Sequence, residues 1–507
     1  MIRKIFYITF LLVPFLSFAQ DILINKGEII KDRQFLIDKT EITACDENGN
    51  FVSVRPHRIN GTLRNYFIEF FDKLDFIERQ EIETENSTEI LEVFIKNNKV
   101  HVLIKEIDNK YATIRIDLFD LTTKKFVKKN LISAEKDSEK VFFDALKYNN
   151  QISVIHDDNY LLNFPVVDDN IAFTYLEFFD GDLNSQSYHE IYPNKNIHRK
   201  NTTFLNVSQY NNKTYILYSL HDEKDGNYYQ LTEYSNNETR DLILPIEADT
   251  YQLINTLSDD ESFIINGLFS KKKKGTFEGF SYYKVNLNRF ELTSYKISDF
   301  HSEDAKKYFI GLFKSNRSID IKELFIDKEQ NTYLIGQFYS IRHQQVPIGI
   351  PIASFASSSF TAFITYNPFS VSYKVYDDIL ISKINSSGEL IWDKILEIKE
   401  TEKIDVRSNK QDSSYFAYFE NNQLNILMNG YIDMDKDKLI VKQDKRNSKT
   451  NFYNITVNNR GEITPKIIFP NADSDILFRA EGSLKFNNTI LNLGQGNMTK
   501  QLLKLDF

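Results

Sequence analysis

The chain has 507 residues, of which 62 are basic and 71 acidic, and its formal net charge is −9. This excess of acidic residues argues against nucleic-acid binding, which depends on a positive surface that neutralises phosphates. Phenylalanine and tyrosine are abundant, at 41 and 28, while glycine and proline are scarce, at 17 and 10. Such a composition favours strands and excludes disordered or collagen-like structure.

The N-terminus has the pattern of a secretory signal peptide. Arg3 and Lys4 precede an apolar run at 5–16, and Ala19 ends a small-residue cleavage pattern. The run is shorter than the roughly 20 residues of a bilayer span, so we expect cleavage after Ala19 and not a membrane anchor. We therefore predict a signal peptide at 1–19 and an exported mature chain without a transmembrane segment. Its location would be the periplasm, the outer cell surface or the extracellular space.

The chain contains one cysteine, Cys45, and so forms no internal disulfide. Cys45 has no histidine near it in the sequence, and we predict a half-buried strand residue in preference to a redox or catalytic thiol. Stability must then come from burial, for which a chain of this length is sufficient.

A polar turn followed by a short apolar strand recurs eight times along the chain. Asparagine and aspartate at these turns tolerate left-handed backbone and bond their own main chain. The segment after each turn is rich in β-branched and aromatic residues. The copies are DENGNFVSV (46–54), KNNKVHVLI (96–104), YNNQISVIH (148–156), YNNKTYILY (210–218), SDDESFIIN (258–266), DKEQNTYLI (327–335), ENNQLNILM (420–428) and FNNTILNLG (486–494).

Each copy is followed by a second strand pair, such as ILISKINSSGELIWDKIL at 379–396. Most copies are also preceded by an apolar stretch, so each unit contains about four strands, and no segment shows a convincing helical pattern. Eight four-stranded antiparallel units predict an all-β fold, a single β-propeller domain at 20–507 with eight blades. Seven blades is the alternative, if NYLLNFPVVDDN at 159–170 displaces part of the third blade.

The eighth unit ends at KQLLKLDF (500–507), where its last strand should begin. The strand-like segment DILINKGEII (21–30) has no other assignment. We predict that it pairs beside residues 501–506 and closes the ring, which removes exposed strand edges. The only tryptophan, Trp392, is predicted on the outermost strand of the sixth blade, packed against its neighbours.

The sixth and seventh units resemble uncharacterised secreted β-propeller-like repeat proteins of the Bacteroidota. The resemblance lies mainly at 344–430, in YDDILISKINSSGELIWDKIL (376–396) and the small-residue segment before it. The signal peptide ending Phe18-Ala19-Gln20 is typical of the same group. The resemblance implies a source and an exported location, and no activity.

One acidic segment resembles a calcium-binding loop. Asp433, Asp435 and Asp437 alternate as the first three ligands of an EF-type loop do, and Asp444 stands at the twelfth position. Lys438 occupies the position where that loop needs glycine, so a solvated turn between two strands is the competing interpretation. Calcium is the only cofactor that the sequence suggests.

Two further groups of polar residues are weaker candidates for metal sites. Asp180, Asp182 and Asn184 repeat the alternating pattern of the acidic segment. His189 and His198 are the closest approach to a histidine pair, and a zinc site would need at least one more ligand. We expect turn residues and unpaired loop histidines at these positions.

The segment from Gln344 to Tyr373 contains no charged residue, in a chain that is 26% charged. We predict an insertion between the second and third strands of the sixth blade. It would form either a long hairpin or lid packed on the protein itself, or an exposed apolar patch that meets a partner. In the second case the partner-binding side chains are Ile348, Ile350, Phe355 and Phe363.

Two classes of function remain. No nucleophile elbow and no phosphate-binding glycine loop occurs in the sequence. We therefore expect a non-enzymatic binding or scaffolding propeller with a protein or glycan partner. The alternative is a secreted glycan hydrolase or lyase that uses paired carboxylates. No pair stands out, and Asp377 and Asp378 are marked no better than others.

Overall fold

A computed structural model gives the fold of most of the chain. It describes residues 22–31, 42–59, 62–84, 87–149, 151–156, 159–168, 171–193, 202–222, 226–246, 249–258, 261–271, 277–315, 317–351, 363–398, 403–405, 415–435, 438–442, 450–471, 476–496 and 499–507. The predicted signal peptide lies outside these residues.

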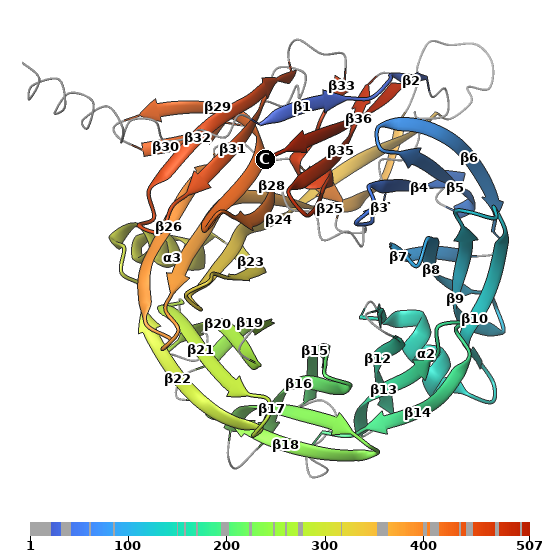
Figure 1. The fold of residues 1–507 in the computed structure, drawn as a ribbon, viewed down its shortest axis with the longest axis horizontal. Helices are drawn as coiled ribbons and strands as arrows, with labels where there is room; N and C mark the ends of the chain where they lie inside the picture. Colours follow the sequence, from blue (N-terminus) through green and yellow to red (C-terminus); the bar gives the residue numbers. More distant parts are fainter. Residues whose placement is uncertain are drawn as a thin grey trace, which may run out of the picture.

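The chain forms a ring of eight antiparallel blades, an eight-bladed β-propeller (Figure 1). In the first, second, fourth and fifth blades the first strand lies nearest the axis and the last lies at the rim (Figure 1). The first blade consists of β3 (Ile42–Cys45), β4 (Asn50–Ile59), β5 (Thr62–Asp72) and β6 (Asp75–Glu83), and the second of β7 (Ser87–Lys96), β8 (Lys99–Ile107), β9 (Tyr111–Asp120) and β10 (Phe126–Glu135). The third consists of β11 (Ser153–Ile155), β12 (Tyr160–Asp168), β13 (Ile171–Phe179) and β14 (Ser185–Ile191), and the fourth of β15 (Thr202–Tyr210), β16 (Lys213–Asp222), β17 (Gly226–Ser235) and β18 (Glu238–Leu244). The predicted eight-bladed fold is confirmed, and the seven-blade alternative is wrong.

The other four blades carry the additions to the regular pattern. The fifth blade consists of β19 (Asp249–Ser258), β20 (Ser262–Ser270), β21 (Gly279–Asn286) and β22 (Glu291–Asp299), and the sixth of β23 (Arg317–Ile326), β24 (Thr332–Pro351), β25 (Phe363–Ile384) and β26 (Leu390–Ile398). The seventh consists of β28 (Tyr415–Glu420), β29 (Gln423–Asp435), β31 (Asn451–Val457) and β32 (Ile463–Pro470). The eighth consists of β33 (Ile476–Leu477), β34 (Ser483–Phe486), β35 (Thr489–Gly496) and β36 (Thr499–Asp506) together with β1 (Leu23–Lys26) and β2 (Ile30–Lys31). The short strand β27 (Lys403–Asp405) pairs with β25. Strand β30 (Lys438–Lys442) joins β29 to β26. A 3-10 turn, η5 (Ala480–Gly482), precedes β34.

The N-terminal strands complete the eighth blade, as predicted. Leu23 pairs with Asp506 and Lys26 with Leu503 on β36, and Ile30 pairs with Lys500 further along the same strand. The two ends of the chain therefore share one sheet, which covers the edge of β36.

A buried ion pair adds to this closure. The Lys500 ammonium on β36 contacts the Glu69 carboxylate on β5, and both side chains have 0% exposure. Arg79 on β6 also contacts Glu69, with Nη2 2.6 Å from Oε1. The pair thus joins the eighth blade to the first at the point where the ring closes.

Hydrophobic burial is distributed around the ring. The described residues contain eight buried apolar clusters, and each lies between two neighbouring blades. Because each strand alternates its side chains between the two faces of its blade, one sheet contributes to two clusters. Each hydrophobic cluster of the described residues is therefore formed by two neighbouring blades, and no single blade buries its apolar side chains alone.

Two helices correct the expectation of an all-strand chain. Helix α2 (Lys140–Tyr148) precedes the third blade, and helix α3 (Glu303–Ser315) precedes the sixth. Asp393 on β26 accepts hydrogen bonds from the amides of His301 and Ser302 at the start of α3, at 3.1 and 2.8 Å. No described helix is both long and apolar enough to cross a membrane.

The third repeat unit also differs from its predicted assignment. The segment at 148–156 supplies the end of α2 and the innermost strand β11, and β12 at 160–168 is the second strand. The segment that motivated the seven-blade alternative is thus an ordinary blade strand. Cys45 is half-buried on β3, as expected, and burial with the nearby Asp46 carboxylate raises its thiol pKa to about 11.

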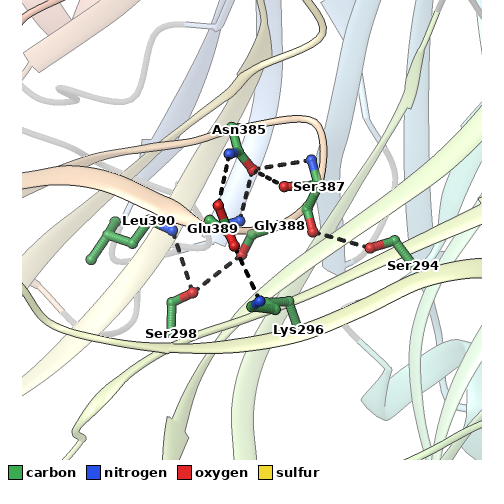
Figure 2. Close-up of polar contacts among 8 residues, drawn as sticks. All are labelled: Ser294, Lys296, Ser298, Asn385, Ser387, Gly388, Glu389 and Leu390. Carbon is green, nitrogen blue, oxygen red and sulfur yellow. Dashed lines mark hydrogen bonds and ion pairs between the residues drawn. The ribbon is translucent and has the colours of Figure 1, made fainter.

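The recurring turns belong to two types. Four Asn-Asn pairs, at 97–98, 211–212, 236–237 and 421–422, are two-residue hairpin turns with left-handed backbone at both positions, as at Asn211 (φ 48°) and Asn212 (φ 60°). Longer turns begin with a capping Asp or Asn side chain. Figure 2 shows one of them, in which Asn385 Oδ1 accepts hydrogen bonds from the amides of Ser387 and Glu389 at 3.0 and 2.8 Å.

These longer turns lie against the preceding blade, which explains the position of Trp392. In the sixth blade, the carbonyls of Ser387 and Gly388 accept hydrogen bonds from Ser294 and Ser298 of the fifth, at 3.1 and 3.2 Å (Figure 2). In the seventh blade, the turn at 458–462 covers Trp392, whose Nε1 donates to the Asn459 carbonyl at 3.0 Å. The predicted location of Trp392 on the outermost strand of the sixth blade is confirmed.

Substituting Gly388 with alanine is expected to destabilise the protein by about 1–3 kcal/mol. Gly388 has φ +90°, and an added Cβ would lie 2.7 Å from Tyr282 Cδ1 and 2.8 Å from Lys296 Cβ. Gly181, in the corresponding turn of the third blade, has no atom within 4 Å of an added Cβ, which makes Gly181→Ala the matched control. Urea unfolding of both variants measures the difference. Equal stability would contradict the close packing of this turn.

Candidate functional site

Helix α2 is held against the ring by one apolar face. Phe143 and Leu146 are buried in the cluster between the second and third blades, while Phe142 and Ala145 are half-buried beside them. This spacing of three and four residues places the four side chains on one side of a helix. The helix lies beside the third blade in Figure 1.

The end of α2 is fixed by Asn149. Its backbone amide donates to the Ala145 carbonyl at 3.1 Å, and its side-chain Nδ2 donates to the Pro165 carbonyl on β12 at 2.8 Å. Asn149 Oδ1 accepts a hydrogen bond from the Gln151 amide at 2.8 Å. One side chain therefore ends the helix and attaches it to the blade that follows.

A cleft of about 440 Å³ lies between this helix end, the third blade and the fourth blade. Its volume is within the range of small-ligand pockets, roughly 300–1,000 Å³. We call it the α2 cleft. It is lined by Asp144, Ala145, Tyr148, Asn149, Gln151, Pro165, Val167, Ala172, Phe173, Thr202, Thr203, Phe204 and Tyr218.

Four aromatic rings contribute to the lining, and they differ in exposure. Phe173 and Tyr218 are buried, Phe204 is half-buried, and Tyr148 is 69% exposed at the rim. Lys147 lies against the Tyr148 ring, with Nζ 4.9 Å from its centroid. The buried rings form an apolar interior, and Tyr148 extends that surface outward.

The polar groups of the α2 cleft are almost all neutral. Asn149, Gln151, Thr202 and Thr203 supply amides and hydroxyls. Thr202 Oγ1 is shielded from solvent and has no hydrogen-bond partner among the described residues. A shielded hydroxyl without a partner lowers the stability of the folded protein, and a hydrogen bond from a bound polar ligand would restore it.

Asp144 is the only carboxylate among the thirteen residues that line the α2 cleft, and the same lining contains no histidine, cysteine, lysine or arginine. Glycoside hydrolysis usually needs two carboxylates, and acyl transfer needs a nucleophile beside a base. The lining can therefore bind a ligand and lacks the pairs of groups on which these reactions depend.

Two carboxyl groups elsewhere have raised pKa values, and both belong to the sixth blade. Burial raises the pKa of Glu323 to about 8 and that of Asp378 to about 6. Glu323 pairs across β24 with Ile381, three residues from Asp378. Two strand spacings and three residues place their α-carbons roughly 14 Å apart. Side chains alternate between the two faces of a strand, and Asp378 is an odd number of residues from Ile381, so the two carboxyl groups point to opposite faces of the blade and do not form a hydrolytic pair.

The clearest buried histidine is structural. His101 Nδ1 donates to the Lys99 carbonyl at 3.0 Å and Nε2 accepts from the Tyr160 hydroxyl at 2.8 Å. Burial lowers its pKa to about 4, so the ring is neutral. His189 lies against Tyr234, with ring centroids 4.8 Å apart, and His198 is outside the described residues.

The acidic segment has its backbone partly described. Asp433 pairs with Ile440 and Asp435 with Lys438 in the hairpin of β29 and β30, and Asp437 is outside the described residues. Within the described part of the chain, no three His, Cys, Asp or Glu side chains are grouped for a metal ion. Calcium binding by the three aspartates stays a prediction.

The weaker copy of this pattern is a capped turn. Asp180 Oδ1 accepts hydrogen bonds from the amides of Asp182 and Asn184, at 2.9 and 2.8 Å. These bonds, led by the one from Asn184, lower the Asp180 pKa. The Asp180 carboxylate therefore caps its own turn, as the side-chain amide of Asn385 does in the equivalent turn.

The uncharged segment extends the hairpin of the sixth blade. Ile348 pairs with Tyr366, and Pro351 pairs with Phe363, so β24 and β25 continue as a ladder far beyond the other blades. Phe355 is outside the described residues, as are the side-chain positions of Ile348, Ile350 and Phe363. The ladder covers both ends of this segment, and partner binding by these side chains stays a prediction.

The α2 cleft was not predicted from the sequence, because no helix was expected before the third blade. A signal for it existed in KVFFDALKY at 140–148, where the apolar residues recur at helical spacing. The tripeptide YNN at 148–150, which overlaps the end of this segment, was interpreted as another hairpin turn. The residues from 202 to 218 carry no signal that separates them from other blade strands.

No protein-family model matches the sequence, and no curated protein matches it. Among solved structures, the chain is similar to the WD40 domain of SCAP from fission yeast, with 7% identity, a TM-score of 0.39, and coverage of 96% of this chain and 99% of that one. It is also similar to the β-propeller domain of the Trilobed protease from Pyrococcus furiosus, with 11% identity, a TM-score of 0.34, and coverage of 85% and 96%.

A third similar structure is a polysaccharide lyase, an ulvan lyase, with 8% identity, a TM-score of 0.37, and coverage of 81% of this chain and 90% of that one. Each of the three TM-scores is below 0.5.

Proposed function

We propose that the protein is an exported, non-enzymatic binding propeller that holds a small ligand or one end of a larger one in the α2 cleft. The observation that carries the proposal is the lining of this cleft, which combines aromatic rings with neutral hydrogen-bonding groups and one carboxylate. Concave, mostly apolar pockets with a few convergent polar groups are the usual form of ligand sites.

Export is supported by the signal-peptide pattern at 1–19. Scaffolding is compatible with the fold, because a closed propeller ring leaves only short strand edges exposed and so offers a rigid platform. The blades on either side of the α2 cleft are part of this ring, so the ligand site is preorganised on rigid elements.

Substituting Thr203 with tryptophan is expected to fill the α2 cleft and abolish ligand binding. Thr203 is exposed on β15 and lines the cleft, so the larger side chain occupies the ligand volume without entering a core. Thr239, exposed on β18 of the same blade and outside the cleft, gives the matched control Thr239→Trp.

The measurement is thermal unfolding of parent and variants with neutral oligosaccharides, acidic oligosaccharides, dipeptides and nucleosides. A ligand present at about 100 times its Kd stabilises the folded state by about 2.7 kcal/mol, which raises the Tm. The parent and Thr239→Trp should respond to the same probe, and Thr203→Trp should not. A response that survives in Thr203→Trp would contradict the assignment of the site.

The hydrolase or lyase alternative is tested in the same experiment. After prolonged incubation with the parent protein, the stabilising probe should be recovered intact by mass spectrometry. Recovery of cleaved sugars would replace the binding function with an enzymatic one, and would require a second reactive group besides Asp144.

A further inference from the structure

We infer that the ligand of the α2 cleft is a neutral oligosaccharide, which stacks on the accessible rings of Phe204 and Tyr148 and donates its hydroxyl groups to Asp144. This inference rests on the proposed function and specifies its ligand class. Three observations support it: the arrangement of the rings, the inventory of polar groups, and the absence of a basic residue from the described lining.

The aromatic rings suit a ligand with flat, weakly polar faces. A pyranose ring presents one face of C–H bonds, which packs on an aromatic ring, and an edge of hydroxyls, which needs hydrogen-bond partners. Phe173 and Phe204 line the interior of the α2 cleft, and Tyr148 lines its rim. Lys147 Nζ is 4.9 Å from the Tyr148 centroid, a cation–π contact that favours one ring position.

The exposed rim indicates a chain of sugars and not a single enclosed one. Tyr148 is 69% exposed and Val167 is 51% exposed, and Gln151 and Thr203 are also exposed where they line the cleft. A ligand seated on the half-buried Phe204 therefore has open space along the rim for further sugar units. The closed side is formed by the buried Phe173 and Tyr218.

The polar groups match hydroxyls better than charges. Asn149 and Gln151 carry both donors and acceptors, and Thr202 offers a shielded hydroxyl that has no partner among the described residues. Sugar hydroxyls also donate and accept, so they satisfy such a mixed set. Asp144 only accepts when ionised, and two neighbouring hydroxyls can donate to its two oxygens.

The charge of the described lining favours neutral glycans over acidic ones. A uronate or sulfate in the α2 cleft would be close to the Asp144 carboxylate, and the described lining has no lysine or arginine to compensate. Removing such an anion from water without a cationic partner is unfavourable. Lys147 contacts the Tyr148 ring from outside the set of lining residues.

The experiment is calorimetric titration of the full mature chain with maltohexaose, cellohexaose, mannohexaose and xylohexaose, and with hexasaccharides of galacturonic acid and heparin. We expect at least one neutral hexasaccharide to bind and the acidic ones not to bind. Tyr148→Ala should weaken that binding about tenfold through the lost stacking surface. Asp144→Asn should weaken it about tenfold through the lost charged acceptor.

Two controls separate the cleft from the rest of the surface. Tyr188 is 65% exposed on β14 of the third blade and does not line the cleft, so Tyr188→Ala should bind as the parent does. Thr239→Trp should also bind as the parent does, and Thr203→Trp should not bind. Thermal unfolding of each variant confirms that it is folded.

Each other outcome overturns a specific claim. Binding of the acidic hexasaccharides alone, or of a dipeptide or nucleoside alone, with loss in Thr203→Trp, would overturn the inference and leave the proposed function intact. Binding of a neutral hexasaccharide that Thr203→Trp retains would overturn the site and with it the inference. No binding by any probe class would overturn both the inference and the proposed function.

Discussion

Substituting Glu69 with alanine is expected to lower the free energy of unfolding by about 3–5 kcal/mol, because the fully buried Lys500 ammonium then loses the Glu69 carboxylate. Both side chains are fully buried in the folded ring, where the eighth blade meets the first. The loss should appear as a lower urea midpoint. Trp392 is the only tryptophan and lies in the sixth blade, so its fluorescence reports whether an opened closure destabilises the distant part of the ring.

Glu233 gives the matched control for this substitution. It is also a buried glutamate on the third strand of a blade, and its partners Lys213 and Arg240 are 30% and 49% exposed. Removing Glu233 leaves both cations in contact with water, so Glu233→Ala should cost clearly less than Glu69→Ala. Glu69→Leu combined with Lys500→Met should restore most of the stability, since it removes both buried charges. Equal losses for the two alanine variants would contradict a special role of the closure pair.

The ring and its closure were predictable from the sequence because both rest on local signals. The Asn-Asn turns have the left-handed backbone that their residue type favours, and the truncated last unit needed one strand that only residues 21–30 could supply. The same reasoning failed at Tyr148-Asn149-Asn150. Asn149 has an extended backbone, with φ −86°, and ends a helix, while Asn211 in the same tripeptide context is left-handed, with φ 48°.

The α2 cleft could not be predicted, because it depends on how separate blades are placed. Its floor includes Phe173 on β13 and Tyr218 on β16, which belong to different blades. Both positions have the ordinary pattern of buried strand aromatics, and nothing in the sequence indicates that they share a cavity. The buried ion pair of Glu69 and Lys500 could not be predicted for the same reason, since the two residues lie near opposite ends of the chain.

Stability is expected to fall as the pH rises from about 6.5 to about 8, chiefly because of Glu323. Between about 4 and 6.5 the buried neutral His101, whose pKa is lowered to about 4, acts in the opposite direction. Burial raises the pKa of Glu323 from 4.5 to about 8, and its shielded Oε2 accepts no hydrogen bond among the described residues. The folded protein therefore holds a proton that the unfolded chain releases near pH 4.5. The stabilisation from this proton is complete below that pH and is lost as the pH approaches 8. Asp378 contributes in the same direction between 3.8 and about 6.

Substituting Glu323 with glutamine removes this proton equilibrium and keeps the shape of the neutral side chain. Because Glu323 is half-buried and not fully enclosed, we expect a gain of about 2–4 kcal/mol for Glu323→Gln over the parent at pH 8.5, and little difference at pH 4.5. Urea unfolding at half-unit pH intervals measures both limits, with exposed Glu47→Gln as the control that should follow the parent throughout. A parent whose stability stays level from pH 6.5 to 8, or a Glu323→Gln variant with the same pH slope as the parent, would show that the Glu323 carboxylate is solvated in the folded ring.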